Sequence, residues 1–375
     1  MNIAELLPGL LKGLANFTLG NAVMITVALI LIYLAVFKEM EPVLLLPIGF
    51  GCLLANIPLA GMTAAEGIMG VLYNAGIKTE LFPLLIFVGV GAMIDFSPLL
   101  AQPRMVLLGA AGQFGIFGTL MLAIALGFPL NQAASIGVIG AIDGPTSIFV
   151  ATKLAPELLA PIAVAAYSYM SLIPIIQPPL MKLLTTKRER LIRMDYAPKP
   201  ISQKTLVLFP IVLTLVVGLL VPDATPLISM LMLGNLLKVS GVVDRLSKAA
   251  QNEIINIATL FLGLAIGATM SAAAFLNFDT GKILVLGLIA FVLDTVAGLL
   301  FGKLMCVLSG YKINPLIGAA GISAFPMAGR LAAKTANDED SHNFILMHAM
   351  GANTAGQLGS VIAGGILLSI VSKLV

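Results

Sequence analysis

The stretch GAIDGPTSIF, residues 140–149, sets the carboxylate of Asp143 directly before Gly144 and Pro145, within a very apolar part of the chain. Proline has no backbone N–H and disfavours helical geometry in the residue before it, while glycine adopts conformations that other residues avoid. The pattern therefore predicts a helix that stops near Ile142 and restarts after Pro145.

A broken helix with a carboxylate is suited to binding a cation. Backbone carbonyls freed at the break need partners, because unsatisfied polar groups are costly in hydrocarbon. Asp143 adds an anionic oxygen, and Thr146 and Ser147 add hydroxyl oxygens, so the set suits Na⁺ or another hard ion. A carboxylate at membrane depth indicates a functional role. The simpler alternative is that Asp143 caps the restarting helix without any ion, since Asp is a favoured N-cap.

Two other acids and one base lie in or beside apolar runs. Asp95, in MIDFSP, ends such a run and is expected at the membrane interface. Asp294, in AFVLDTVAG, has apolar residues on both sides and no Gly-Pro break, and its simpler interpretation is a buried partner for Lys303 or Arg330. Arg330 itself either extends its side chain to the surface or binds a carboxylate-bearing ligand. Its planar guanidinium is better suited to the second task than a lysine ammonium group.

The segment 162–180 carries Tyr167 and Tyr169 in apolar surroundings. Buried tyrosines need hydrogen-bond partners for their hydroxyl groups. Residues two positions apart do not share a helix face, so we expect at most one of the two to point into a polar site. An interfacial aromatic is the alternative for Tyr167.

The composition indicates that membrane helices position these side chains. Of 375 residues, 59% are hydrophobic and only 10% are charged, far from the roughly 25% charged residues of soluble proteins. Several apolar runs approach the ~20 residues of a spanning helix, so we expect an all-α polytopic membrane protein. The net charge of +3, without a basic and aromatic surface, argues against nucleic-acid binding.

The cysteines and histidines do not indicate a transition-metal centre. Cys52 and Cys306 lie inside separate apolar runs, and His342 and His348 are six residues apart. That spacing does not place two imidazoles on one helix face. We therefore expect Na⁺ as the only metal ion.

Two segments depart from the apolar pattern. Residues 1–20 carry leucines at helical spacing and lack a cleavage site, which indicates an interfacial helix rather than a secretory signal. Residues 185–204 lie in the longest polar interruption, where Lys and Arg outnumber the acids. By the positive-inside rule, this linker is expected to face the cytoplasm.

Weak sequence matches across this linker indicate an internal duplication. The matching pairs are GVGAMID (89–95) with AIGATMS (265–271), GAIDGPT (140–146) with AGISAFP (320–326), and GCLLAN (51–56) with GNLLKV (234–239). They predict a first transmembrane repeat at 21–184 and a second at 205–375. Transporters with inverted-topology repeats bind substrate where paired segments are broken near the bilayer midplane, here at 143–146 and 323–326.

The second predicted break offers only neutral oxygen donors. Ser323 lies in the break, Asn314 precedes it, and Asn353 follows it. Together with the single carboxylate of Asp143, these donors would balance one monovalent charge.

Three long runs resemble a known family. Residues 140–186, 313–330 and 347–360 are similar to the β subunit of the biotin-dependent sodium-pumping decarboxylases, a family that includes the oxaloacetate, methylmalonyl-CoA and glutaconyl-CoA decarboxylase pumps of anaerobic bacteria. The resemblance covers most of the chain after about Leu34. One departure is Ile142, where a smaller residue is expected before the Asp.

The resemblance implies an enzyme-transporter in the bacterial inner membrane. The implied activity is decarboxylation of carboxybiotin on a partner subunit, coupled to Na⁺ export and to consumption of a proton. The implied partners are a biotin carrier subunit, a carboxyltransferase (α) subunit and a small membrane subunit of the γ/δ type, and the chain is expected to form a homo-oligomer within that complex.

The resemblance also implies functional roles for individual residues. The matching positions are Asp143, Tyr169, Asn314, Gly318, Ser323, Arg330 and Asn353. We expect Asp143, Asn314 and Asn353 to form one Na⁺ site, and Tyr169 and Ser323 to contribute to a second. Arg330 would hold carboxybiotin near the cytoplasmic opening. Protonation of Asp143 or Tyr169 would expel Na⁺, because a carboxylate holds either a cation or a proton.

A second hypothesis from the residues alone is a stand-alone Na⁺/H⁺ antiporter or Na⁺-coupled symporter, since inverted repeats and broken helices serve those proteins equally. Such a protein would work without a biotinylated partner.

Overall fold

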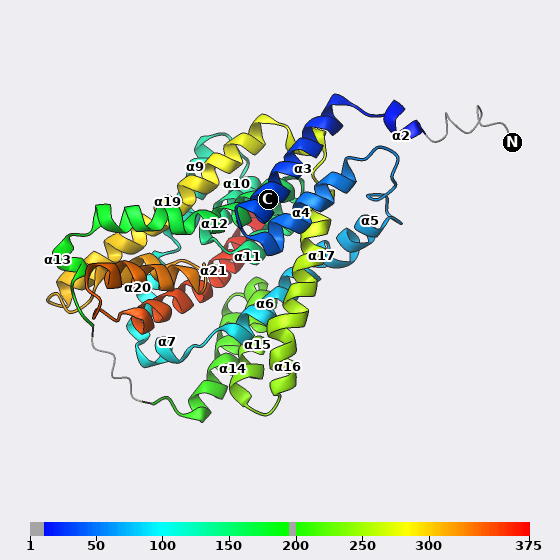
Figure 1. The fold of residues 1–375 in the computed structure, drawn as a ribbon. Helices are drawn as coiled ribbons and strands as arrows, with labels where there is room; N and C mark the ends of the chain where they lie inside the picture. Colours follow the sequence, from blue (N-terminus) through cyan, green and yellow to red (C-terminus); the bar gives the residue numbers. More distant parts are fainter. Residues whose placement is uncertain (1–10, 195–199) are drawn as a thin grey trace, which may run out of the picture.

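The computed structural model describes residues 11–194 and 200–375, and these ranges contain helices and turns but no strand (Figure 1). Residues 1–10 of the predicted interfacial helix and residues 195–199 of the predicted linker lie outside the described residues. The described remainder of segment 1–20 holds the short helix α2 (Lys12–Ala15) and the start of α3.

The first half of the chain is a series of helices, several of them short. Its elements are α3 (Leu19–Phe37), α4 (Pro42–Ala55), α5 (Ile68–Leu72), the π-helix η1 (Tyr73–Ile77), α6 (Leu81–Met93), α7 (Ser97–Ala101), the 3-10 helix η2 (Pro103–Met105), α8 (Val106–Ala111), α9 (Phe114–Ala125), α10 (Leu130–Gly137), the 3-10 helix η3 (Val138–Ala141), α11 (Gly144–Leu154), the 3-10 helix η4 (Pro156–Leu158) and α12 (Leu159–Leu184).

The linker and the second half follow. Their elements are α13 (Lys187–Arg190), α14 (Gln203–Leu220), the 3-10 helix η5 (Pro222–Ala224), α15 (Thr225–Ser240), α16 (Asp244–Ala249), the π-helix η6 (Ala250–Ile254), α17 (Ile255–Ala268), α18 (Ala272–Phe275), α19 (Phe278–Leu308), the 3-10 helix η7 (Pro315–Gly321), α20 (Met327–Glu339) and α21 (Leu346–Leu374).

The starts of three long apolar helices are fixed by local capping. Thr18 before α3, Ser202 before α14 and Asn277 before α19 each accept a hydrogen bond from the backbone N–H three residues later. A side-chain oxygen at this position satisfies one of the N–H groups that have no partner within the helix.

Seven helices among the described residues are long and apolar enough to cross a membrane, and the pair Ile68–Ile77 and Leu81–Met93, bent by 63°, forms a further broken candidate. The chain is therefore a multi-pass membrane protein, as its composition predicted. The candidate spans differ in burial: 72% of the window in α21 is buried, against 11% in α14. Hence α21 is a central helix and α14 a peripheral one.

The two halves contain corresponding elements in the same order. Each half has two helices, a bent segment with a π-helix, a very short helix, a long hydrophobic segment, a broken helix and a final long helix. The helix α4 of the first half packs on α17 of the second, and α15 of the second half packs on α6 of the first. This exchange of partners is the relation expected between two copies of one unit.

The glycines of the matched motifs lie at these two helix crossings. A Cβ atom on Gly51 would lie 2.5 Å from the carbonyl oxygen of Leu264, and one on Gly267 would lie 2.2 Å from that of Ile48. Only glycine permits helices to approach this closely. The motif matches therefore correspond to a packing requirement.

The α6–α15 crossing has the same construction. A Cβ atom on Gly91 would lie 1.8 Å from the carbonyl oxygen of Leu231, and one on Gly234 would lie 1.9 Å from that of Val88. The sequence matches pair Gly51 with Gly234 and Gly91 with Gly267, so corresponding glycines occupy corresponding crossings. The inverted orientation of the two repeats in the membrane stays a prediction.

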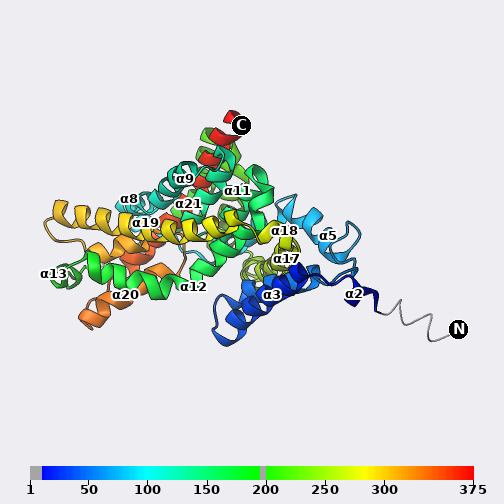
Figure 2. The same ribbon diagram turned by 90° about the horizontal axis from the view of Figure 1, so that it is seen from above.

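The helices gather into two groups that pack against each other (Figures 1 and 2). One group is built around the α4–α17 and α6–α15 crossings, with α3 and α14 beside it. The other is built around α12, α19, η7, α20 and α21 and contains both predicted breaks. We call the second group the break-containing group.

Candidate functional site

The first predicted break lies between η3 and α11. Ile142 adopts a left-handed conformation with φ 53°, Asp143 is the N-cap, and α11 begins at Gly144. The predicted stop near Ile142 is confirmed. The predicted restart after Pro145 is wrong, because Pro145 lies within the first turn of α11, where a residue without an N–H loses no helical hydrogen bond.

The carboxylate of Asp143 is buried and accepts several hydrogen bonds. Its side chain belongs to a residue only 5% exposed. Its Oδ2 accepts from Thr146 Oγ1 at 2.7 Å, Gln357 Nε2 at 2.8 Å and Ser360 Oγ at 2.9 Å. The backbone N–H of Thr146 lies 3.5 Å from Oδ1. Asp143 therefore does cap α11, and the three side-chain donors on its other oxygen add a polar site that a cap does not require.

The second predicted break joins η7 to α20 and also contacts α21. Ser323 Oγ donates to the carbonyl oxygen of Gly356 over 3.0 Å. Asn353 Nδ2 donates to the carbonyl oxygen of Ile322 over 2.7 Å, and Asn353 Oδ1 accepts from the backbone N–H of Gly329 at 3.4 Å. Asn353 thus connects the end of the break to the first turn of α20.

One face of α21 connects the two breaks. Asn353, Gln357 and Ser360 are spaced four and three residues apart, and such residues share a helix face. Asn353 contacts the second break, and the other two contact Asp143 at the first. The sequence analysis missed Gln357 and Ser360, although their helical spacing from Asn353 in an apolar span was a usable signal.

Asn314 lies at the far end of η7 from this face. Its Nδ2 donates to the carbonyl oxygens of Arg190 at 3.0 Å and Ile192 at 2.9 Å. The structure therefore does not bring Asn314 to Asp143 and Asn353, as the predicted first Na⁺ site requires. The reason is geometric: the 3-10 helix that separates Asn314 from the break is seven residues long, or roughly 14 Å.

Gly318 marks the closest approach of η7 to α19. A Cβ atom on Gly318 would lie 2.1 Å from the carbonyl oxygen of Gly298, and one on Gly298 would lie 2.3 Å from that of Gly318. Because it has no side chain, Gly318 allows η7 to pack closely on α19. This gives a physical reason for a position that only the resemblance had indicated.

The two tyrosines of α12 point to different neighbours. The half-buried Tyr169 donates its hydroxyl to the carbonyl oxygen of Leu284 in α19. The ring of Tyr167, at 2% exposure, packs against Gly144 at the start of α11, so the interfacial alternative for Tyr167 is wrong. In the described structure no hydrogen bond joins Tyr169 to Ser323, the predicted contributors to a second Na⁺ site, because each donates to a different backbone carbonyl.

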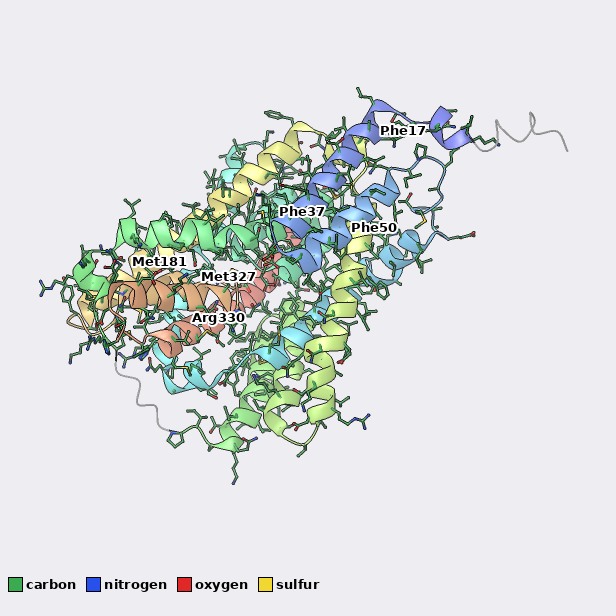
Figure 3. The ribbon with its side chains drawn as sticks, viewed as in Figure 1. Phe17, Phe37, Phe50, Met181, Met327 and Arg330 are labelled. Atoms are coloured by element: carbon green, nitrogen blue, oxygen red, sulfur yellow. The ribbon has the colours of Figure 1, made fainter. Side chains whose placement is uncertain are left out.

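Arg330 is exposed on α20, one turn after Met327 (Figure 3). Its guanidinium makes no ion pair or hydrogen bond within residues 11–194 and 200–375. The adjacent residue, Gly329, is the one that donates to Asn353. Arg330 is thus an available cation beside the second break.

The buried acid Asp294 does not have the partner that its simpler interpretation required. Lys303 instead lies 3.5 Å from Glu189 and donates to the carbonyl oxygen of Leu184 at 3.0 Å, and Arg330 is unpaired in the described residues. The expectation fails because Lys303 lies more than two helical turns further along α19, at the end that meets the linker.

The described part of the linker is attached to α20 by two ion pairs. Arg190 contacts Glu339 at 2.8 Å, and Arg193 contacts Asp340 at 2.7 Å. The hydrogen bond from Arg193 holds the pKa of Asp340 below its ordinary value. With the two hydrogen bonds from Asn314, these contacts fasten the linker across the ends of η7 and α20.

Comparisons with known proteins identify close relatives. The profile of the family described as "Na+-transporting oxaloacetate decarboxylase beta subunit" matches residues 20–371. The methylmalonyl-CoA decarboxylase subunit beta of Veillonella parvula is 55% identical, over 96% of each chain. The glutaconyl-CoA decarboxylase subunit beta of Acidaminococcus fermentans is 53% identical, over 96% of each chain. The oxaloacetate decarboxylase beta chain of Klebsiella pneumoniae is 49% identical, over 96% of this chain and 97% of its own.

Proposed function

The chain belongs to the family of β subunits of the Na⁺-transporting decarboxylases, and on that premise we propose that it decarboxylates carboxybiotin carried by a partner subunit and uses this step to export Na⁺. Family membership favours this function over a stand-alone Na⁺/H⁺ antiporter or symporter. The observation that carries the coupling is the buried carboxylate of Asp143, which is held between the first break and α21.

Asp143 is the group at which Na⁺ and a proton compete. Its hydrogen-bonding neighbours Thr146 and Ser360 are hydroxyls, and a hydroxyl can donate to a carboxylate or turn its lone pairs to a cation. The same oxygens therefore serve a carboxylate with Na⁺ and one without it. A proton on Asp143 removes the charge that attracts Na⁺, so protonation releases the ion and provides the proton consumed when CO₂ is formed.

The other residues that the family resemblance indicates support the action of Asp143, some from nearby and one from a distance. Asn353 is a neutral oxygen donor on the same face of α21, and Ser323 lies beside it at the second break. Tyr169 serves as a second proton-holding group, facing α19. Asn314 acts at a distance from Asp143, by holding the linker at the end of η7.

Arg330 is the group that binds the carboxybiotin carboxylate. Its exposed, unpaired guanidinium offers paired donors that match a carboxylate in geometry. Because the neighbouring Gly329 bonds to Asn353, binding at Arg330 can displace the second break. The break-containing group would then move relative to the other helices in alternating access.

The relatives are named as β subunits or β chains, so this chain works as one subunit of several. We propose a biotin carrier, a carboxyltransferase (α) subunit and a small γ/δ-type membrane subunit as its partners, several copies of the chain in the complex, and the bacterial inner membrane as its location. The linker 185–204 faces the cytoplasm, where the soluble partners lie. The repeats 21–184 and 205–375 have inverted orientations in the membrane.

The test is Na⁺-dependent, avidin-sensitive decarboxylation by the purified complex, with ²²Na⁺ uptake into vesicles. We expect Asp143→Asn to abolish both activities. The matched control is Asp338→Asn, at an exposed acid of α20, which should retain both. Na⁺/H⁺ exchange by this chain alone, without any effect of avidin, would instead identify an antiporter.

A further inference from the structure

Asp294 is a second acid at membrane depth, and the proposed pumping cycle does not use it. It lies in the middle of the 31-residue helix α19 and is fully buried. Its Oδ1 accepts a hydrogen bond from the backbone N–H of Gly115, in the first turn of α9. Its Oδ2 is buried and has no hydrogen-bond partner among the described residues.

Among the described residues, no charged group faces this carboxyl. The elements that pack on α19 include α8, α9, α10, η3 and η7, and none of these contains an acidic, basic, Tyr, His or Cys residue. The other element that packs extensively on α19 is α12. It contributes Tyr167, Tyr169 and Lys182, of which Tyr167 packs on Gly144, Tyr169 bonds to Leu284 and Lys182 is exposed.

The titratable groups of α19 itself are also turned elsewhere. They are Asp279, Lys282, Lys303 and Cys306. Asp279 and Lys282 pair with each other, and Lys303 pairs with Glu189. Cys306 lies more than three turns beyond Asp294. No described group therefore provides the positive charge that an ionised Asp294 would need.

Burial without a counter-charge favours the neutral acid. A buried carboxylate must recover its lost hydration from partners, or else take up a proton. One backbone donor at the start of α9 recovers only part of that hydration. The one hydrogen-bond partner of Asp294 among the described residues is a backbone N–H, which cannot ligate a metal cation, whereas Thr146 and Ser360 place hydroxyl oxygens beside Asp143. A proton is therefore the better occupant of Asp294 than Na⁺.

The position of Asp294 relates it to both breaks. Gly115, which bonds to Asp294, packs against Gly140 just before the first break, where a Cβ atom would lie 2.8 Å from the carbonyl carbon of Gly115. One turn after Asp294, Gly298 meets Gly318 of the segment that leads to the second break. A displacement of either break therefore alters the surroundings of Asp294.

Phe291, one turn before Asp294, strengthens this relation. It packs in a small apolar cluster with Ile142 of the first break and Ile322 of the second. Asp294 thus lies one helical turn from Phe291, the residue of α19 that packs with both breaks in this cluster. We propose that Asp294 is a second proton-binding site of this chain, which is protonated in the conformation described here and exchanges its proton when the breaks move.

The exchange during turnover rests on the proposed pump function, but the presence of the proton does not. Infrared spectra of the complex in vesicles separate the two, because the C=O stretch of a protonated carboxyl differs from the bands of a carboxylate. Spectra of wild type and variants are compared for the presence of the proton, and spectra before and during turnover for its exchange. We expect the wild type to show such a band, Asp294→Asn to lose it, and Asp143→Asn to keep it. We expect its intensity to change when decarboxylation with Na⁺ is started.

Each result decides the proposal. A protonated-carboxyl signal that is unchanged in Asp294→Asn means that Asp294 is ionised, and the proposal fails. A signal that is lost in Asp294→Asn but never changes during turnover of the wild type identifies a permanently neutral structural acid, and the exchange is refuted. If Asp294→Asn does not assemble, absence of the band from Asp143→Asn overturns the proposal. A complex that does not pump Na⁺ yet shows the band would refute the proposed function while leaving the proton on Asp294 in place.

Discussion

The side-chain amide of Gln357 donates to Oδ2 of Asp143 over 2.8 Å and so joins the first break of the chain to its last helix. Ser360 reaches the same oxygen from the next turn of α21. The carboxylate that we propose to bind the cation is therefore held from both halves of the chain, and a movement of either half changes its hydrogen bonds.

Removing one of these donors should weaken Na⁺ binding. Ser360→Ala deletes a hydroxyl that stabilises ionised Asp143 and can ligate the ion. A hydrogen bond to a charged group contributes about 1.5–3 kcal/mol, so we expect the Na⁺ concentration for half-maximal decarboxylation to rise about tenfold or more. The maximal rate should change little.

The measurement is the Na⁺ dependence of decarboxylation by the complex. Ser372→Ala provides the control, because Ser372 is an exposed serine near the end of the same helix. An unchanged Na⁺ dependence in Ser360→Ala would separate this hydroxyl from the ion site.

Gly318→Ala should destabilise the protein through packing alone. The new methyl group would meet the carbonyl oxygen of Gly298 at 2.1 Å, and this contact is between backbone segments that cannot rotate away. Overpacking of this kind costs about 1–3 kcal/mol. We expect a lower Tm for the purified protein, together with lower Na⁺-coupled activity.

The control for this change is Gly281→Ala, in the same helix α19 that Gly318 contacts. A Cβ atom on Gly281 would meet nothing within 4 Å, and alanine favours helix over glycine by roughly 0.5–1 kcal/mol. Its Tm should stay constant or rise. Equal effects of the two substitutions would contradict the packing argument.

The sequence was sufficient to locate the breaks but not to assemble the site. Gly144 and Pro145 mark the first break by their backbone chemistry. Asp143 can be recognised beside them because a charged side chain at membrane depth is costly and therefore indicates a function. The pairing of Asp143 with Gln357 could not be inferred, because 214 positions separate them and the packing of α11 on α21 sets their distance.

The same limit explains the misplacement of Asn314. Asn314 could join Asp143 and Asn353 in the predicted site only if the chain between Asn314 and the second break folded back, whereas that chain forms the extended 3-10 helix η7. A short apolar segment with Gly and Pro does not reveal from its sequence which of these conformations it adopts.

Asn314→Ala should release the linker rather than the ion. The side chain makes two hydrogen bonds to the carbonyl oxygens of Arg190 and Ile192, each contributing about 0.5–1.5 kcal/mol. We expect trypsin to cleave the basic segment 187–193 about tenfold faster or more in the variant. Cleavage should occur in inside-out vesicles and not in right-side-out ones.

Asn252→Ala is the control, because Asn252 bonds only within its own turn, to the carbonyl oxygen of Lys248. A linker equally resistant in Asn314→Ala and in the wild type would show that other contacts hold it. Cleavage from the opposite side of the membrane would reverse the proposed orientation.

The linker contact at Asp340 should depend on pH only in strong acid. Its pKa lies below the ordinary value of 3.8 because Arg193 donates to it. Because this pKa is lowered, ionised Asp340 stabilises the attachment of the linker fully at pH values above the ordinary pKa. The stabilisation is lost as the pH falls through the lowered pKa of Asp340. Hydrogen exchange of residues 187–194, corrected for intrinsic rates, should therefore be constant from neutral pH to about pH 5 and increase only below the ordinary pKa. In Asp340→Asn the exchange should be faster at neutral pH and lack this step, whereas a step near pH 6 would assign the dependence to another group.

Arg330 should distinguish binding of carboxybiotin from binding of Na⁺. A lysine keeps the charge but offers no planar pair of donors, so Arg330→Lys should resemble Arg330→Ala, with decarboxylation reduced about tenfold to a hundredfold, the loss of one or two charge-assisted hydrogen bonds. The Na⁺ concentration for half-maximal activity should stay constant, because the guanidinium contacts none of the side chains around Asp143.

Lys334→Ala, one turn further along the exposed side of α20, controls for general loss of positive charge. If Arg330→Lys keeps the full activity of the wild type, the residue acts as a point charge that attracts the carrier subunit. A change in Na⁺ dependence instead would place Arg330 in the ion pathway.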